Sequence, residues 1–115
     1  MQPQDSLPAL LEKLRSFREK RDWRQFHTPK NLAMSISIEA AELMEHFQWL
    51  TPDESETYIH QDTGRQEVAE ELADILMYCF HLADIMGLDV EKTVLDKMEK
   101  NEKRFPVDRV YGKFK

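Results

Sequence analysis

Apolar side chains recur at intervals of three and four residues along most of this chain, which is the spacing of one face of an α-helix. The first run predicts a helix over about residues 7–21 and consists of Leu7, Leu10, Leu11, Leu14 and Phe17. The same period predicts further helices over about residues 29–50, 52–60, 65–86 and 90–104. No alternation of apolar and polar residues reaches strand length, so the pattern predicts an all-α protein.

Start and stop signals stand at the expected helix ends. Thr28 followed by Pro29 is a typical helix start, and Thr51 with Glu54 three residues later forms a capping box. The sequence "HQDTG" reads as a loop before the long helix. The remaining signals are the N-cap Asp89 and the helix terminators Gly87 and Pro106.

The chain has 115 residues, which is long enough for one domain with a core and too short for two. We therefore expect a single domain over residues 1–115, a helical bundle of four main helices plus a short one. Helices of about twenty residues with apolar side chains on more than one face usually pack between two neighbours. In so short a chain the second neighbour is expected to be another copy, so the pattern predicts a homo-oligomer.

The net charge of -6 is unevenly distributed. Residues 1–30 carry a net +3, residues 31–91 carry -13 and residues 92–115 carry +4. This acidic middle disfavours nucleic-acid binding, because it would repel a phosphate backbone and no basic stripe with interleaved aromatic residues is present. An acidic centre between basic ends fits a site that holds a cation and then an anion. It fits a solvated acidic surface equally well.

Several features predict a cytoplasmic protein that does not enter membranes. The single cysteine, Cys79, allows no disulfide within the chain, which fits a reducing compartment. The first twenty residues lack the basic and then apolar segments of a secretion signal. No apolar run approaches the ~18 residues that predict a membrane span.

Acidic residues occur three apart in six Glu-x-x-Glu or Glu-x-x-Asp pairs, a spacing that puts both carboxylates on one helix face. Two pairs, Glu39–Glu42 and Glu71–Asp74, have apolar neighbours on both sides. Burying an unpaired carboxylate costs several kcal/mol, and the middle of the chain offers only Arg65 as a partner. The two pairs therefore predict a cage of four carboxylates around a metal between two helices. The alternative is a wet helix face.

Ligands that are all oxygen favour Mg²⁺, and they would also accept Mn²⁺ or Ca²⁺. His46 and His81, the histidines nearest the acids, are expected at a helix surface or the edge of the core. The isolated glycines form no phosphate-binding loop, so phosphate would be held by metal and basic side chains. One face of the last helix supplies such side chains: Lys97, Lys100, Asn101 and Arg104. A lysine-rich solvated helix is the alternative.

Aromatic side chains lie close to these acids along the sequence and predict a pocket for a base. Trp23, Phe26 and His27 precede the second helix. Trp49 ends that helix, seven residues after Glu42 and so on roughly the same face. Tyr78 follows Asp74 by one turn. The alternative is a set of core aromatics, as we expect for Phe17, Phe47 and Phe80 and as Trp49 would also allow.

In these segments the sequence resembles the MazG-type all-α nucleoside triphosphate pyrophosphohydrolases, and it is most similar to their small single-domain dCTP pyrophosphatase branch. The resemblance covers about residues 14–106 and rests on "RDWRQFHTPKNL", "EAAELMEHFQW", "EELADILMY" and "KMEKNEKRFP". The family pattern is Glu-x-x-Glu, a spacer and Glu-x-x-Asp. Here it corresponds to Glu39, Glu42, a gap of 28 residues, Glu71 and Asp74.

The resemblance implies a function and the residues that serve it. The reaction would be hydrolysis of a deoxynucleoside triphosphate, dCTP-like, between its α and β phosphates, which sanitises the nucleotide pool. Mg²⁺ would bind the four carboxylates. The nucleotide pocket would be lined by Trp23, His27, Trp49 and Tyr78. The triphosphate would be held by Lys97, Asn101 and Arg104.

Two further expectations concern the general base and the assembly. A carboxylate that the metal does not fully use would act as base, with Glu42 the first choice and Glu45 the second. Members of the family assemble as dimers or tetramers with sites built across subunits, and we favour a tetramer here. Animal dCTP pyrophosphatases carry a His nine residues before the loop Trp, where this chain has Leu14.

Three other functions fit parts of the sequence. A related all-α hydrolase would act on dUTP or phosphoribosyl-ATP. A helical oligomer that binds a nucleotide without turnover would show affinity and no product. A purely structural bundle would become more stable when Glu71 is replaced by Ala, with or without metal.

Overall fold

The computed structural model describes residues 6–113, and this part of the chain is helical without any strand. The expected all-α class is therefore confirmed. The elements in chain order are α1 (Leu7–Lys20), the 3₁₀ helix η2 (Arg24–Phe26), α2 (Pro29–Glu45), α3 (Pro52–Tyr58), α4 (Asp62–Ile85), α5 (Val90–Arg104) and α6 (Val107–Val110). The four long helices and the short α3 match the expected set.

The expected caps are present and explain where the helices begin. The side chain of Thr28 accepts a hydrogen bond from the backbone N–H of Asn31 at the start of α2. At the start of α3 the Glu54 N–H donates to Thr51 Oγ1 at 3.1 Å, and the Thr51 N–H donates to Glu54 Oε1 at 2.9 Å. This reciprocal pair is a complete capping box. Asp89 caps α5 in the expected way.

Two expected helix boundaries are wrong. Helix α2 ends at Glu45 rather than near residue 50, and the next residues form a series of tight turns. Helix α4 begins at Asp62, so the expected loop "HQDTG" ends inside its first turn. Gly64 is buried there, and a Cβ at this position would clash with the carbonyl oxygen of Tyr58. The glycine thus serves close packing of α3 on α4 rather than a loop.

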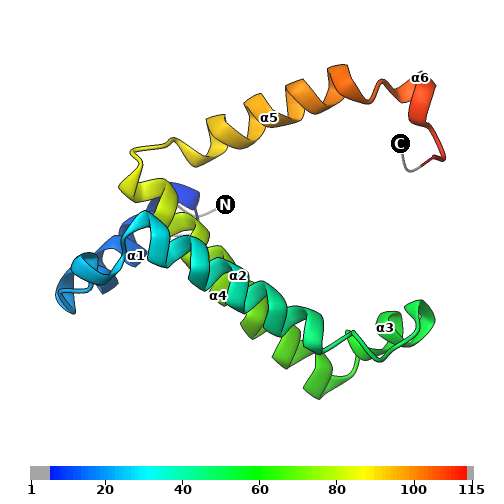
Figure 1. Ribbon diagram of the computed structural model, residues 1–115, viewed down its shortest axis with the longest axis horizontal. Helices are drawn as coiled ribbons and strands as arrows, with labels where there is room; N and C mark the ends of the chain where they lie inside the picture. Colours follow the sequence, from blue (N-terminus) through cyan, green and yellow to red (C-terminus); the bar gives the residue numbers. More distant parts are fainter. Residues whose placement is uncertain (1–5, 114–115) are drawn as a thin grey trace.

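Helices α2 and α4 form the centre of the molecule. They run antiparallel along each other, α1 packs against α4, and α3 closes the turn at one end (Figure 1). Leu32 is the one apolar side chain that is buried in the described part of the chain. The apolar faces of the long helices are therefore only partly covered.

The chain exposes far more surface than a finished monomer of its size. Its accessible area is 9244 Å², whereas a folded monomer of 13.7 kDa exposes about 6600 Å². Its radius of gyration is 17.3 Å, against about 13 Å for a compact domain of this length. Helix α5 accounts for part of the excess, because it projects away from the α2–α4 pair (Figure 1).

Helix α5 also carries exposed apolar side chains along its length. Val94, Leu95 and Met98 each keep more than half of their surface in solvent. Gly87, whose φ is 69°, turns the chain sharply between the end of α4 and the start of α5. Among the described residues, no helix combines the length and the apolar character needed to cross a membrane.

Candidate functional site

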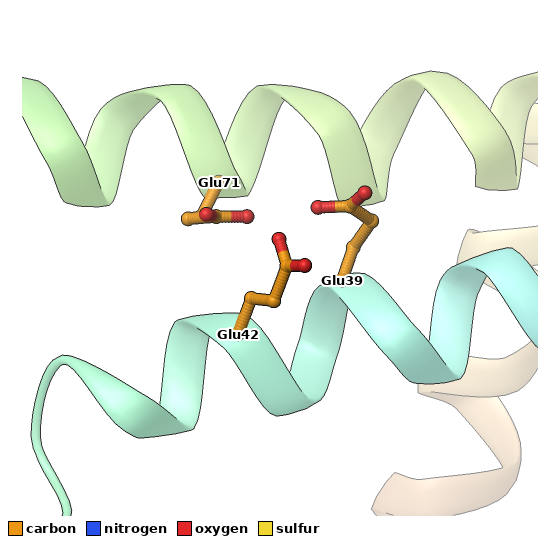
Figure 2. A group of neighbouring side chains, drawn as sticks. All are labelled: Glu39, Glu42 and Glu71. Carbon is orange, nitrogen blue, oxygen red and sulfur yellow. The ribbon is translucent and has the colours of Figure 1, made fainter.

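Three carboxylates meet in the space between α2 and α4. Glu39 and Glu42 lie one turn apart on α2, and Glu71 faces them from α4 (Figure 2). One oxygen from each side chain lies within 4.8 Å of the others. The spacing of three on α2 and the antiparallel packing of α4 bring them together. We call Glu39, Glu42 and Glu71 the carboxylate cluster.

Few basic side chains of the described residues lie near the carboxylate cluster. One oxygen of Glu39 and one of Glu71 are buried without a hydrogen-bond partner in the described structure. The nearest basic group is His46, whose Nε2 lies 3.9 Å from Glu71 Oε1. No Lys or Arg of the described chain forms an ion pair with these three residues. Such orphaned buried oxygens fit a divalent cation.

The environment of the cluster changes the pKa of Glu39. Burial, hydrogen bonding with Glu71 and Glu42, and the negative charges of Glu42 and Asp74 raise the pKa of Glu39 from 4.5 to about 7. Burial is the largest cause, and the neighbouring negative charges disfavour ionisation of Glu39 further. A divalent cation would reverse this effect by stabilising the charged carboxylates.

Two other acids of the sequence analysis lie outside the cluster. Asp74 follows Glu71 by three residues on α4, near enough for its charge to raise the pKa of Glu39. Its side chain is not among the three converging residues and lines a neighbouring pocket instead. Glu45 is the last residue of α2 and is exposed. The expected cage of four carboxylates therefore appears here as three carboxylates and a neighbour.

A pocket of about 320 Å³ opens beside Asp74, between α1, the η2 loop and α4. Three of the expected nucleotide-binding residues, Trp23, His27 and Tyr78, come together on its walls. The other lining residues are Lys13, Leu14, Phe17, Met77 and His81. The site thus combines a mostly aromatic and apolar pocket with a cluster of carboxylates, and Asp74 borders both.

The wall formed by α1 differs from expectation. Phe17 is 46% exposed and lines the pocket, so its expected place in the core is wrong for this chain. Its ring meets that of Trp23 edge to face at 5.8 Å. The guanidinium of Arg21 lies 3.6 Å from the centre of the Phe17 ring on the outside. These contacts hold the loop tryptophan at the pocket.

The most buried polar residue of the pocket, His81, is not among the residues expected there from the sequence. His81 is 6% exposed, whereas a position at a helix surface or the edge of the core was expected. Its ring lies 4.7 Å from that of His27, centre to centre. The available signal was spacing, because His81 follows Tyr78 by three residues and Asp74 by seven and so shares their face of α4.

A part-buried ion pair lies near the two histidines. Arg18 is 4% exposed, and its Nη2 donates to Asp84 Oδ2 at 2.9 Å. Arg15 Nη2 contacts the other oxygen of the same carboxylate at 2.5 Å. Burial, His27 and Arg18 lower the pKa of His81 to about 4, while Asp84 opposes this only in part. Burial, Arg18 and Arg24 also lower the pKa of His27.

Four expected substrate-binding residues lie away from this pocket within one chain. Trp49 is 87% exposed, because α2 ends before it and the helical register that would place it above Glu42 is lost. The other three lie on the exposed helix α5: Lys97, Asn101 and Arg104. Within one chain the acids and the aromatic pocket therefore lie together, and the basic face of α5 lies away from them.

The site has a Glu-x-x-Glu segment and a Glu-x-x-Asp segment that face each other from two antiparallel helices, with aromatic residues in the neighbouring loop. Together these features define one class of all-α proteins. The chain belongs to the MazG-like family, whose model matches residues 34–113. This confirms the family inferred from the sequence.

Individual proteins of known sequence or structure are also similar to this chain. The chain is similar to "dCTP pyrophosphatase 1" of Rattus norvegicus, at 36% identity over 105 residues that cover 91% of this chain and 62% of the rat protein. It is 41% identical over 91 residues to the Bos taurus protein of the same name, covering 79% and 54% respectively. The chain thus spans 54–62% of the length of these relatives. Among solved structures, a pyrophosphatase from Archaeoglobus fulgidus DSM 4304 is similar with a TM-score of 0.80 and 48% identity, covering 87% of this chain and 92% of that one.

Proposed function

We propose that this protein is a nucleoside triphosphate pyrophosphohydrolase that needs Mg²⁺. It would hydrolyse a deoxynucleoside triphosphate, dCTP-like, between the α and β phosphates and release the monophosphate and pyrophosphate. Such an activity would remove unwanted nucleotides from the pool. The names of the mammalian and archaeal relatives support the reaction class.

The observation that carries this proposal is the border between the carboxylate cluster and the aromatic pocket. A nucleotide has a flat base and an anionic phosphate chain. The rings of Trp23 and Tyr78 offer faces for the base. Phosphates placed beside Asp74 would meet the carboxylate cluster, and two anionic groups can share that space only with cations between them.

The donor set fits Mg²⁺, and Mn²⁺ is the closest substitute. Glu39, Glu42 and Glu71 would hold the ion, with Asp74 completing the set towards the substrate. When bound, Mg²⁺ would offset the phosphate charge and favour attack by water. Glu42 is the exposed member of the cluster and is our first choice for the base that orients that water. Glu45, one turn further and exposed, is the second.

We also propose that the active form is a homo-oligomer. The excess of about 2600 Å² over the area of a compact monomer is of the size that permanent interfaces bury. Exposed apolar residues occur on α5 and, separately, on the two helices of the α2–α4 pair. Two surfaces favour a tetramer built as a dimer of dimers over a dimer. A partner's α5 would then bring its basic face to the phosphates: Lys97, Asn101 and Arg104.

Incubation with each deoxynucleoside triphosphate, with and without Mg²⁺, tests the proposal. Chromatography should show the monophosphate and pyrophosphate only when the metal is present. The panel should include dUTP and phosphoribosyl-ATP, which would identify the related hydrolases. Nucleotide affinity without any product would support a binding module instead and would exclude the enzyme.

A further inference from the structure

The pocket contains an imidazole whose hydrogen-bonding groups are not used by the protein. His81 is 6% exposed and forms part of the pocket lining. In the described part of the chain no side-chain hydrogen bond to its ring is present, and its neighbours there are the His27 ring and the Arg18–Asp84 pair. The ring nitrogens of His81 are not among the polar atoms that are sealed from solvent without a partner, so they remain open to a partner on a ligand in the pocket.

The charges around His81 determine what it can offer. Arg18 is permanently charged and buried beside both histidines, and it lowers the pKa of each. His81 is therefore neutral at pH 7, with one nitrogen as donor and the other as acceptor. His27 adds a buried Nδ1 without a partner in the described structure. The pocket thus has flat aromatic faces and two neutral imidazoles among them.

We propose that His81 is a specificity residue that reads the hydrogen-bonding edge of the nucleobase, with His27 beside it. This inference rests on the proposed function. Stacking on Trp23 and Tyr78 would hold any base, because every base has an aromatic face. Only hydrogen bonds to the edge distinguish one base from another. A site that hydrogen-bonds its substrate rejects analogues that leave its buried polar groups unpaired.

The Arg18–Asp84 pair is a positioning element that prepares the two histidines for contact with the edge of the base. Asp84 holds Arg18 through the 2.9 Å hydrogen bond, and Arg15 holds Asp84 from the other side. Burial and, to a smaller extent, the fixed positive charge of Arg18 lower the pKa of both histidines, so their acceptor nitrogens remain available.

The test is the base preference of His81→Leu, a change that removes the hydrogen-bonding groups and keeps an apolar side chain of similar size. The kcat/KM is measured for dCTP, dUTP, dTTP, dATP and dGTP. We expect the value for the preferred base to fall by about tenfold or more, and those for poor substrates to fall much less. His60→Leu, the same change at an exposed turn after α3, should leave every ratio unchanged. An equal loss for all five nucleotides would overturn the inference.

A second variant and a second readout keep the test decisive. His81→Gln retains a donor and an acceptor in a different geometry, and we expect it to change the ratio of dCTP to dUTP by about threefold or more. An unchanged ratio would count against the role of His81 even if the leucine variant fails to fold. Equilibrium binding of the nucleoside monophosphates gives the same ratios without turnover. A base preference in binding that depends on His81, without any pyrophosphate release, would reject the proposed function and uphold the inference.

Discussion

Replacement of Glu71 by Gln separates a metal site from an ordinary acidic surface. The change keeps the shape of the side chain and removes one negative charge from a cluster whose oxygens lie within 4.8 Å of one another. Two unit charges at that distance repel by about 3.5 kcal/mol at an effective dielectric constant of 20 and by about 0.9 kcal/mol in water. Because Glu42 is exposed to solvent, the lower figure applies to the repulsion between Glu42 and Glu71.

In metal-free protein at pH 8 we therefore expect Glu71→Gln to raise the free energy of unfolding by about 1 kcal/mol, or the melting temperature by about 4 °C. In Mg²⁺ the order should reverse. A ligand present at 100 times its Kd stabilises the native state by about 2.7 kcal/mol, and the variant would lose most of this gain. Thermal melts at one fixed protein concentration, in chelator and along a Mg²⁺ series, measure both effects.

The matched control is Glu70→Gln, one residue away and on the exposed side of α4, where the carboxylate contacts Gln66. It should change neither the metal-free stability by more than a few tenths of a kcal/mol nor the response to Mg²⁺. The reasoning about the cluster is refuted if Glu71→Gln lowers the metal-free stability. It is refuted equally if the variant and the wild type respond to Mg²⁺ alike.

Three further predictions follow from other parts of the molecule. In metal-free protein the raised pKa of Glu39 means that the folded state keeps a proton that the unfolded state loses. The free energy of unfolding should therefore fall as the pH rises from about 4.5 to about 7. Glu39→Gln should flatten this dependence on pH in urea titrations. Asp84→Asn should cost about 3 kcal/mol in denaturant unfolding because it leaves the buried Arg18 with the exposed Glu19 as its one remaining ion-pair partner among the described residues. Asp96→Asn, which breaks an exposed pair, should cost less than about 1 kcal/mol. Leu95→Glu on α5 should lower the mass measured by light scattering, and an unchanged oligomer would contradict the proposed interface.

Local signals along the sequence predicted the helices well because they act through neighbouring residues. A cap such as Thr51 needs only Glu54, three positions away, to fix where a helix begins. The same locality explains the carboxylate cluster. Residues three apart share a face, and two long helices joined by a short one pack antiparallel. The spacing of the acids together with their apolar neighbours therefore predicted Glu39 and Glu42 opposite Glu71 and Asp74.

The missed features depend on packing between distant segments. The end of α2 at Glu45 moves Trp49 off the expected face, and no strong stop signal marks that end in the sequence. His81 and Arg18 are 63 positions apart in the chain, and the packing of α1 on α4 brings Arg18 close enough to lower the pKa of His81. In the proposed oligomer α5 would contact another chain, and a sequence pattern can indicate such a contact but cannot place it.

The central claim is that this chain cleaves a deoxynucleoside triphosphate at the α–β bond with the help of a metal held by the carboxylate cluster. Phosphorus NMR of a reaction with dCTP tests it most directly. With Mg²⁺ we predict signals of the monophosphate and pyrophosphate, and their disappearance in chelator and in Glu71→Gln. Signals of the diphosphate and orthophosphate would contradict the claim, as would dCTP left unchanged alongside the other deoxynucleotides in the presence of metal.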